Sequence, residues 1–420
     1  MNKKLLILLF VITALPFVAM YWGRGVQADS PKPPPAANRE EEFGIETITD
    51  TAFRRIVQEY EAYVEEAIAK EGVPGAAVAI VKDGKIAYLR GFGLKQVGTH
   101  DSIDVHTVFR LASLSKGFAP VLTGLLVEDG ELDWDDRVVS YLPDFKLKDK
   151  KSTQALSLRH VLSHTTGLPR HAYSNLLNDG MLYEQIVCKL KDVRLPYQVG
   201  KHHDYQNVAY SLIGDVVANQ TGQSYNELLK ERLFEPANMK DASAGYNDMM
   251  ATVNVALPHN VGKSGYYSTD ISPRYYSASP AAGVNASISD MGQWLRLLMG
   301  NRPDIIKAST LREIFTPQVQ MPLRESTLYQ WRPLERAWYA LGWRVMERSE
   351  EQRLIYHGGF VNNYRGEVAF SVEDQVGVVI LSNAVSSFIS EAAPRFFDLY
   401  WYLYPSLEPE DHQKQLSSNQ

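Results

Sequence analysis

The chain has 420 residues, of which 45% are hydrophobic and 22% charged, and this composition predicts a globular protein with a large core. A net charge of −6 and a pI near 6.0 provide no basic face of the kind that binds nucleic acid, so no nucleic-acid partner is expected. The single cysteine, Cys188, excludes an internal disulfide, and its apolar neighbours predict a buried small side chain.

The first 28 residues have the features of a secretory signal. Lys3 and Lys4 precede an apolar stretch over about 5–22, which is followed by the small-residue site Val26-Gln27-Ala28. The stretch is nearly long enough to cross a bilayer, so an uncleaved membrane anchor is the alternative. Both interpretations predict a periplasmic or secreted protein that contacts the membrane only through this segment. The Pro-rich, charged residues 29–48 predict an extended linker.

Residues 49–404 predict one folded domain, followed by a polar tail over 405–420. Apolar residues at helical spacing indicate a helix over 49–69, and two β-rich runs around Asp83-Gly84 indicate a hairpin. The pattern is mainly helical over about 113–300, returns to strands, and ends in a helix over 386–404. We therefore expect an α+β fold, with an antiparallel sheet built from both chain ends, flanking helices and an inserted helical lobe.

The most informative motif is Ser113-Leu114-Ser115-Lys116, which opens an apolar helical run. On a helix, residues three apart share one face, so the Ser113 hydroxyl and the Lys116 amine are predicted to lie close together. A buried lysine can stay neutral and activate a serine hydroxyl as a nucleophile. Pro120 is expected to kink the helix one turn beyond Lys116, and Gly130 to end it.

A Ser–Lys pair also requires a proton shuttle, and a Tyr-x-Asn sequence could supply one. Tyr205 and Asn207 precede an amphipathic helix, which favours them over Tyr173 and Asn175 in a loop-like stretch.

A strand end is needed beside the serine to hold substrate. His357 ends a β-like run, and the glycines after it, including Gly359, would let a substrate backbone approach the sheet edge. Lys263 is the alternative, although its surroundings lack strand periodicity. No Cys/His cluster has zinc-ligand spacing, and the adjacent pair His202-His203 should diverge, so neither a metal nor another cofactor is expected.

Taken together, SLSK, LSHTTGLP, YQN and HGGFVNNYRGEVAF resemble the serine β-lactamase and penicillin-recognising hydrolase family, nearest the class C β-lactamase and related esterase branch. The likeness extends from about residue 49 to 404. It implies that Ser113 is the acylated nucleophile, Lys116 its activating partner and Tyr205 the base or proton shuttle. It further implies that Asn207 binds the substrate amide and that the backbone N–H groups of Ser113 and Phe360 form an oxyanion hole.

The sequence departs from this family at His357, where β-lactamases of this branch usually carry the lysine of Lys-Thr-Gly. Histidine is mostly neutral at pH 7, which weakens the expected recognition of a β-lactam carboxylate. Arg365 is one candidate to restore the positive charge. The leading expectation is β-lactam hydrolysis by an exported serine hydrolase, acting on a small-molecule or peptide substrate. The alternatives are a carboxylesterase or D-amino-acid peptidase, and a penicillin-binding protein that is acylated without turnover.

Overall fold

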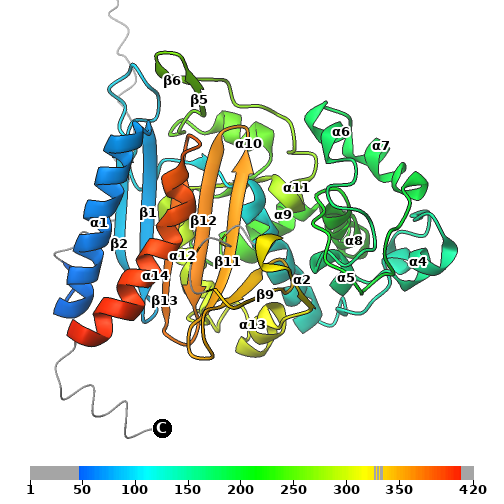
Figure 1. Cartoon of the computed structure of the whole chain (residues 1–420). Helices are drawn as coiled ribbons and strands as arrows, with labels where there is room; N and C mark the ends of the chain where they lie inside the picture. The colour runs from blue at the N-terminus through cyan, green and yellow to red at the C-terminus, as the bar shows by residue number, and fades with distance from the viewer. Residues whose placement is uncertain (1–46, 326–327, 329–330, 332–333, 408–420) are drawn as a thin grey trace, which may run out of the picture. The chain divides into compact units, whose positions relative to one another are not determined.

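The computed structural model describes residues 47–325, 328, 331 and 334–407, all within one compact unit (Figure 1). The predicted signal or anchor, residues 29–46 of the predicted linker and residues 408–420 of the predicted tail lie outside these residues. In the described part of the chain, no helix combines the length and the apolar character that crossing a bilayer requires.

An eight-stranded sheet organises the fold, and every neighbouring pair of strands in it is antiparallel. The order β2-β1-β13-β12-β11-β10-β9-β8 places the N-terminal hairpin beside the last strand of the chain, which confirms the sheet predicted from both chain ends. Its strands are β1 (Gly75–Lys82), β2 (Lys85–Gly93), β8 (Val319–Gln320), β9 (Arg336–Tyr339), β10 (Arg344–Glu347), β11 (Arg353–Val361), β12 (Tyr364–Ser371) and β13 (Val376–Ser382).

The β1–β2 hairpin forms where the sequence predicted it. Asp83 and Gly84 both have positive φ, at 49° and 72°, which is the backbone of the two-residue turn that suits twisted strands. Successive side chains of β1 enter two different hydrophobic clusters, one on each face of the sheet. Strand β1 is therefore apolar throughout because both of its faces are covered.

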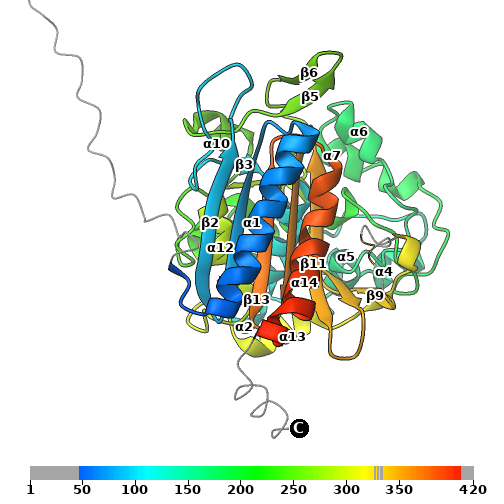
Figure 2. The same cartoon turned by 60° about the vertical axis from the view of Figure 1, so that its left-hand side comes forward.

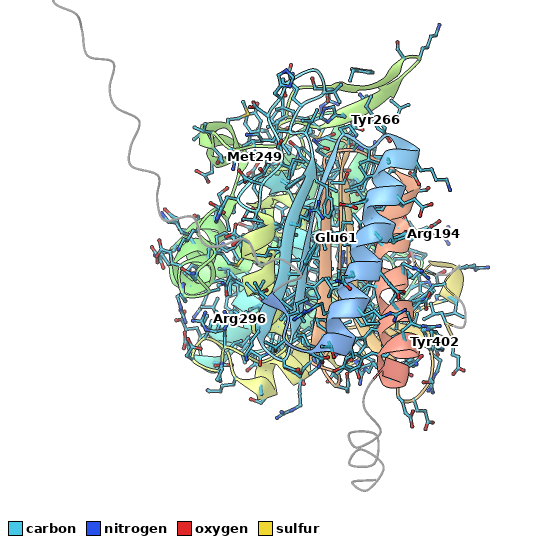
Figure 3. The ribbon with its side chains drawn as sticks, turned by 90° about the vertical axis from the view of Figure 1, so that its left-hand side faces the viewer. Glu61, Arg194, Met249, Tyr266, Arg296 and Tyr402 are labelled. Atoms are coloured by element: carbon cyan, nitrogen blue, oxygen red, sulfur yellow. The ribbon has the colours of Figure 1, made fainter. Side chains whose placement is uncertain are left out.

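Two long helices from opposite ends of the chain cover one face of the sheet. Helix α1 (Thr51–Glu71) begins at Asp50, whose carboxylate accepts the Phe53 N–H at 3.0 Å, and it packs beside α14 (Ser387–Leu407) (Figure 2). Glu61 of α1 is labelled in Figure 3. It accepts hydrogen bonds from two residues of strand β2, from Tyr88 at 2.5 Å and from Arg90.

The opposite face packs against the helical part of the chain, which carries the candidate nucleophile. Helix α12 contacts β1, β2 and β13 directly. The helices of this part are α2 (Phe118–Glu128), α3 (Val138–Tyr141), α4 (Lys150–Ala155), α5 (Leu158–Leu162), α6 (Ser174–Asn178), α7 (Tyr183–Val187), α8 (Leu212–Thr221), α9 (Tyr225–Leu229), α10 (Tyr246–Ala251), α11 (Ser279–Ala282), α12 (Ile288–Leu298) and α13 (Ala308–Phe315). Short 3₁₀ or π segments are η2 (Ala112–Gly117), η3 (Leu190–Asp192), η4 (Ala209–Ser211), η5 (Lys230–Phe234) and η6 (Leu323–Glu325).

Two small sheets interrupt the helical part. One joins β3 (Phe109–Arg110), β7 (Val284–Ala286) and β4 (Ser243–Ala244), and the other is the hairpin of β5 (His259–Gly262) and β6 (Gly265–Ser268). The second corrects the sequence analysis, which found no strand periodicity around Lys263. The missing signal is explained by exposure, since a hairpin with little buried surface has no need of alternating apolar residues.

Two local expectations were wrong. Pro120 does not kink a helix, because the Ser113–Lys116 segment is a separate 3₁₀ turn and Pro120 lies in the first turn of α2, where its missing N–H costs no hydrogen bond. Cys188 is exposed, because the short helix α7 buries Tyr183 and Ile186 and ends before the cysteine.

Candidate active site

The candidate nucleophile lies in a tight turn between strand β3 and helix α2. Ala112 has a positive φ of 53°, an unfavourable conformation for a residue with a Cβ, and Ser113 follows it at the start of η2. Ser113 is half-buried and lines a cleft with a volume of about 760 Å³. The turn thus presents one hydroxyl to the cleft while the neighbouring side chains Ala112 and Leu114 stay buried.

Lys116 is fully buried beneath this serine. Its Nζ lies 3.4 Å from Ser113 Oγ, 2.8 Å from Asn207 Oδ1 and 3.0 Å from the Ala281 carbonyl oxygen. Burial, followed by the charge of Arg344, holds the pKa of Lys116 well below its usual range. A neutral amine has two N–H bonds and one lone pair. The two shorter contacts use the N–H bonds, which leaves the lone pair for the Ser113 proton.

Tyr205 and Asn207 also line the cleft, and the structure brings both to the Ser–Lys pair. The Lys116 amine lies 4.7 Å from the centre of the Tyr205 ring. The pKa of Tyr205 is raised because burial outweighs the lowering effects of Arg344 and of a hydrogen bond with Ser113, so the phenol carries its proton at neutral pH. The Asn207 amide also donates to Ser174 Oγ at 3.3 Å.

The segment LSHTTGLP fixes the backbone of the Tyr205 segment. Gln206 N–H donates to His164 Nδ1 at 3.1 Å, and His171 N–H donates to the Tyr205 carbonyl oxygen at 2.8 Å. The His164 ring lies 4.4 Å from the Tyr205 ring, between centroids, and is fully buried. This packing explains why Tyr205 belongs to a structured wall although no helix begins until Ala209.

His357 does not line the cleft, which corrects the expectation that it contacts substrate. Its imidazole is fully buried, with Nδ1 2.9 Å from the Gly358 carbonyl oxygen and Nε2 3.3 Å from the Tyr339 hydroxyl. Because Nδ1 donates to a carbonyl, Nε2 accepts from the tyrosine. Burial, followed by Arg344 and Lys116, holds the pKa of His357 well below its usual range, so it contributes no positive charge at neutral pH.

Gly359 has a different reason to be glycine from the one predicted. A Cβ at this position would lie 2.6 Å from the Leu111 carbonyl oxygen and 3.2 Å from the Leu114 nitrogen. The residue therefore lets β11 pack directly against the turn that carries Ser113, and the close approach is between two parts of the protein rather than with a substrate.

Phe360, by contrast, lies at the cleft as expected, 57% exposed. Strands β11 and β12 join through Asn362 and Asn363, both at positive φ, and Val361 pairs with Tyr364. In such a two-residue hairpin the closing pair is hydrogen-bonded and the next pair is not. The Phe360 N–H thus points away from β12, toward the edge of β11 that faces η2, as an oxyanion-hole donor requires.

The alternatives from the sequence separate clearly. Lys263 is exposed in the β5–β6 turn, and it is not among the residues that line the cleft. Arg365 turns toward α14, where it donates to Ser390 Oγ at 2.5 Å, so it does not restore a cation to the cleft. Of the second Tyr-x-Asn sequence, Asn175 lines the cleft together with Ser174, while Tyr173 does not.

His202 and His203 diverge as predicted, since His202 stacks on Tyr197 and His203 packs beside Tyr339. Within the described ranges, no group of His, Cys, Asp or Glu side chains is arranged to hold a metal ion.

Two side chains near the site were not predicted from the sequence. Arg344 lies in β10 with its guanidinium carbon 5.6 Å from the Tyr205 ring centroid, and an arginine between Trp343 and Val345 in an apolar strand was the available signal. His171 lines the cleft, and burial lowers its pKa to about 4. Its signal was weak, because it is one polar residue in a loop.

An antiparallel sheet built from both chain ends, with a Ser–Lys pair at the start of a helix beside it, defines a protein of the serine β-lactamase and transpeptidase fold. The family model described as Beta-lactamase matches residues 53–396, and the chain belongs to that family.

The chain is also similar to curated relatives and to a solved structure. The chain is 24% identical to Protein flp of Staphylococcus aureus (strain MRSA252), an alignment that covers 79% of this chain and 64% of that protein. It is 21% identical to Unguisins hydrolase ungD' of Aspergillus campestris, over 80% of this chain and 63% of the relative. The octameric penicillin-binding protein homologue from Pyrococcus abyssi has a TM-score of 0.71 at 24% identity, covering 83% of this chain and 77% of that structure, and supports the fold alone.

Proposed function

We propose that the chain is a serine hydrolase that forms an acyl-enzyme on Ser113 and cleaves esters or amides. The observation that carries this proposal is the donor arrangement of Lys116, whose two short contacts, to Asn207 and Ala281, leave a lone pair for the Ser113 proton. The predicted signal or anchor over residues 1–28 makes export part of the proposal.

The acylation step follows from these positions. The Ser113 proton passes to Lys116 as Oγ attacks the substrate carbonyl carbon, and the carbonyl electron pair moves onto oxygen beside the N–H groups of Ser113 and Phe360. When the bond to the leaving group breaks, the protonated phenol of Tyr205 gives that group a proton, and Tyr205 is reprotonated from Lys116. Water then adds to the acyl-enzyme, releasing the acid and restoring Ser113.

The polar lining of the cleft favours esters and amides over carboxylate-bearing β-lactams. Among its described lining residues there is no lysine or arginine, and Asp270 is a carboxylate. Five asparagines offer amide donors and acceptors suited to an amide or peptide: Asn175, Asn178, Asn207, Asn362 and Asn363. A β-lactam carboxylate would meet no cationic side chain on this lining.

β-Lactam hydrolysis is the second candidate, supported by the family assignment. The chain spans less than two thirds of the length of the curated relatives, and their names support hydrolysis in one case without indicating a substrate for this chain.

Steady-state turnover of three chromogenic substrates tests the proposal: p-nitrophenyl acetate, D-alanine p-nitroanilide and a chromogenic cephalosporin, each with wild type and Ser113→Ala. We expect ester or anilide cleavage that Ser113→Ala abolishes. We expect kcat/KM for the cephalosporin to be at least about 100-fold lower than for the ester or anilide, because its carboxylate meets no cationic side chain. Efficient cephalosporin turnover would reverse the order of the two candidates. A lasting cephalosporin adduct, with none of the three substrates turned over, would favour the penicillin-binding alternative and contradict hydrolysis.

A further inference from the structure

The ring of Tyr205 lies near two basic side chains from different parts of the fold. Lys116 Nζ is 4.7 Å from the ring centroid, and the guanidinium carbon of Arg344 is 5.6 Å from it. The same guanidinium lies 5.6 Å from the centroid of the Tyr339 ring. Arg344 is therefore held against two aromatic rings behind the cleft, and it is not among the residues that line the cleft.

Arg344 is buried without a neutralising partner. Arg344 is only 6% exposed, and its side-chain nitrogens Nε and Nη1 both lack a hydrogen-bond partner. Among the carboxylates of the described residues, none forms an ion pair with it. Buried charges are ordinarily paired because their desolvation is costly, and a guanidinium cannot lose its charge as a lysine can. An unpaired buried arginine is thus a costly feature that calls for a functional explanation.

Glu367 is the acid that interacts electrostatically with Arg344, but it does not supply a counter-charge. The Glu367 carboxyl is fully buried, accepts from the Tyr356 hydroxyl at 2.9 Å, and lies 3.8 Å from Arg365. Burial raises the pKa of Glu367 to about 8, so it is mostly protonated at neutral pH. The positive charge of Arg344 is left facing the tyrosines.

Four basic side chains and two tyrosines make up the other titratable groups that Arg344 affects here. Burial is the main cause that lowers the pKa of Lys116, His164, His203 and His357, and the charge of Arg344 adds to it in each case. On Tyr205 and Tyr339, burial raises the pKa and Arg344 opposes it.

Tyr205 also faces charged and polar groups from two loops. Arg170 lowers its pKa, Tyr275 raises it, and the neutral ring of His171 lies 5.5 Å from the Tyr205 ring centroid. Arg344 is the larger of the two arginine effects on Tyr205.

We propose that Arg344 is a positioning residue whose fixed positive charge, held against the ring of Tyr205, replaces the cation that His357 does not supply. The inference rests on the proposed function. In the acyl-transfer cycle, Tyr205 becomes negative as it gives up its proton, and a nearby guanidinium stabilises that charge. The same charge disfavours a second cation at Lys116 and so keeps the amine available as a base.

This role predicts a particular response to pH. Without Arg344, the pKa of Lys116 rises because a repelling charge is gone, and the pKa of Tyr205 rises because an attracting one is gone. The acid limb of the pH–rate profile reports loss of the Lys116 proton and the alkaline limb reports loss of the Tyr205 proton. Both limbs should therefore move to higher pH together, which a purely structural effect would not produce.

The test uses D-alanine p-nitroanilide or an alkyl ester followed by acid release, since both leaving groups need a proton from Tyr205. A fluorophosphonate that labels activated serines reports Ser113 separately. The proteins compared are wild type, Arg344→Met, Arg344→Lys and Arg336→Met. Arg336 is exposed in neighbouring β9, where it pairs with Glu347 at 3.1 Å, so its variant removes the same charge away from the site. We expect Arg344→Met to slow acylation about 10- to 100-fold at pH 7, the effect of one charge near 6 Å at an intermediate dielectric. Both limbs should shift upward by about one pH unit or more, with KM changed far less than kcat. Arg336→Met should keep the wild-type profile, whereas a buried lysine at position 344 can lose its proton, so Arg344→Lys should shift the limbs in the same direction as Arg344→Met.

Arg344→Met that is folded, with the limbs unshifted and acylation within twofold of wild type, would overturn the role of Arg344. If Arg344→Met does not fold, Arg344→Gln decides, because it removes the charge but keeps a polar side chain, and it must shift both limbs to higher pH. Wild-type protein that is not labelled at Ser113 would contradict the proposed function itself. Labelled wild type, together with Arg344→Met that has an unchanged pH profile and acylation rate, would contradict only the role of Arg344.

Discussion

Lys116 donates to Asn207 Oδ1 across 2.8 Å, and this bond joins the turn that carries Ser113 to the wall that carries Tyr205. Neither partner is exposed enough for water to replace it, since Lys116 is fully buried and Asn207 is 9% exposed. The bond occupies one N–H of the amine, and because the Asn207 amide is uncharged, it does not raise the pKa of Lys116 as a carboxylate would.

A carboxylate at position 207 should disable the site. Asn207→Asp keeps the size of the side chain but places a negative charge 2.8 Å from the amine, which raises the pKa of Lys116 and protonates it at pH 7. We expect the reaction of Ser113 with a fluorophosphonate to slow about 100-fold or more, measured as the rate of labelling. The matched control is Gln220→Glu, which adds the same charge at the exposed end of α8 and should label normally.

A permanent cation at position 116 should be equally harmful. Lys116→Arg keeps a basic side chain that cannot lose its proton, so it cannot accept the proton of Ser113. Ester hydrolysis at pH 7 should fall by about 100-fold or more, and raising the pH should not restore it. Lys263→Arg, in the exposed β5–β6 turn, provides the comparison and should retain activity. Recovery of Lys116→Arg at alkaline pH would argue against Lys116 as the base.

Gly359→Ala tests the packing of β11 on the nucleophile turn. The added methyl would lie 2.6 Å from the Leu111 carbonyl oxygen, so the turn or the strand must move. We expect a loss of about 1–3 kcal/mol in the free energy of unfolding and slower labelling of Ser113. Gly222→Ala adds a Cβ with no atom within 4 Å, so it lacks the clash and should leave labelling unchanged, although its positive φ carries a stability cost that position 359 does not have. Equal labelling in both variants would contradict the packing role of Gly359.

Burial of Glu367 predicts a pH dependence of stability. Its pKa is about 8 in the folded protein and near the ordinary value when unfolded, so the folded state binds the extra proton between those values. Stability contributed by this group is therefore present below the unfolded pKa and is lost as the pH rises toward 8. Glu367→Gln keeps an acceptor for the Tyr356 hydroxyl and removes the titration, so it should lose less stability between pH 5 and pH 9. Thermal unfolding at both pH values measures this difference. Parallel losses in wild type and variant would contradict it.

Much of the fold follows from local pattern, whereas the inner part of the site does not. The hairpin at Asp83-Gly84 and the amphipathic helix α1 have signals within a few residues of sequence. The Ser113–Lys116 pair is equally local. Asn207, 91 positions from Lys116, could be proposed from its motif but not placed by it.

The side chains that sequence patterns misplaced depend on packing between distant segments. The pattern predicted that His357 ends a strand, whereas it lies within β11, and nothing in its sequence neighbours indicates that Tyr339 and Gly358 hold its buried ring. The sequence likewise indicates a close approach at Gly359, but it does not identify the Leu111 carbonyl oxygen as the atom that approaches. Arg365 and Arg344 both lie in strands, but the fold places Arg365 beside α14 and Arg344 beside the rings of Tyr205 and Tyr339. Their sequence neighbours do not indicate this difference.

The most direct measurement of the central claim is the intact mass of wild type and Ser113→Ala after reaction with a fluorophosphonate, followed by peptide mapping of the adduct. An activated Ser113 predicts one adduct per wild-type chain, on the peptide that contains Ser113, and none on Ser113→Ala. Equal labelling of the two proteins, or an adduct mapped to another serine, would contradict the assignment of Ser113 as the nucleophile.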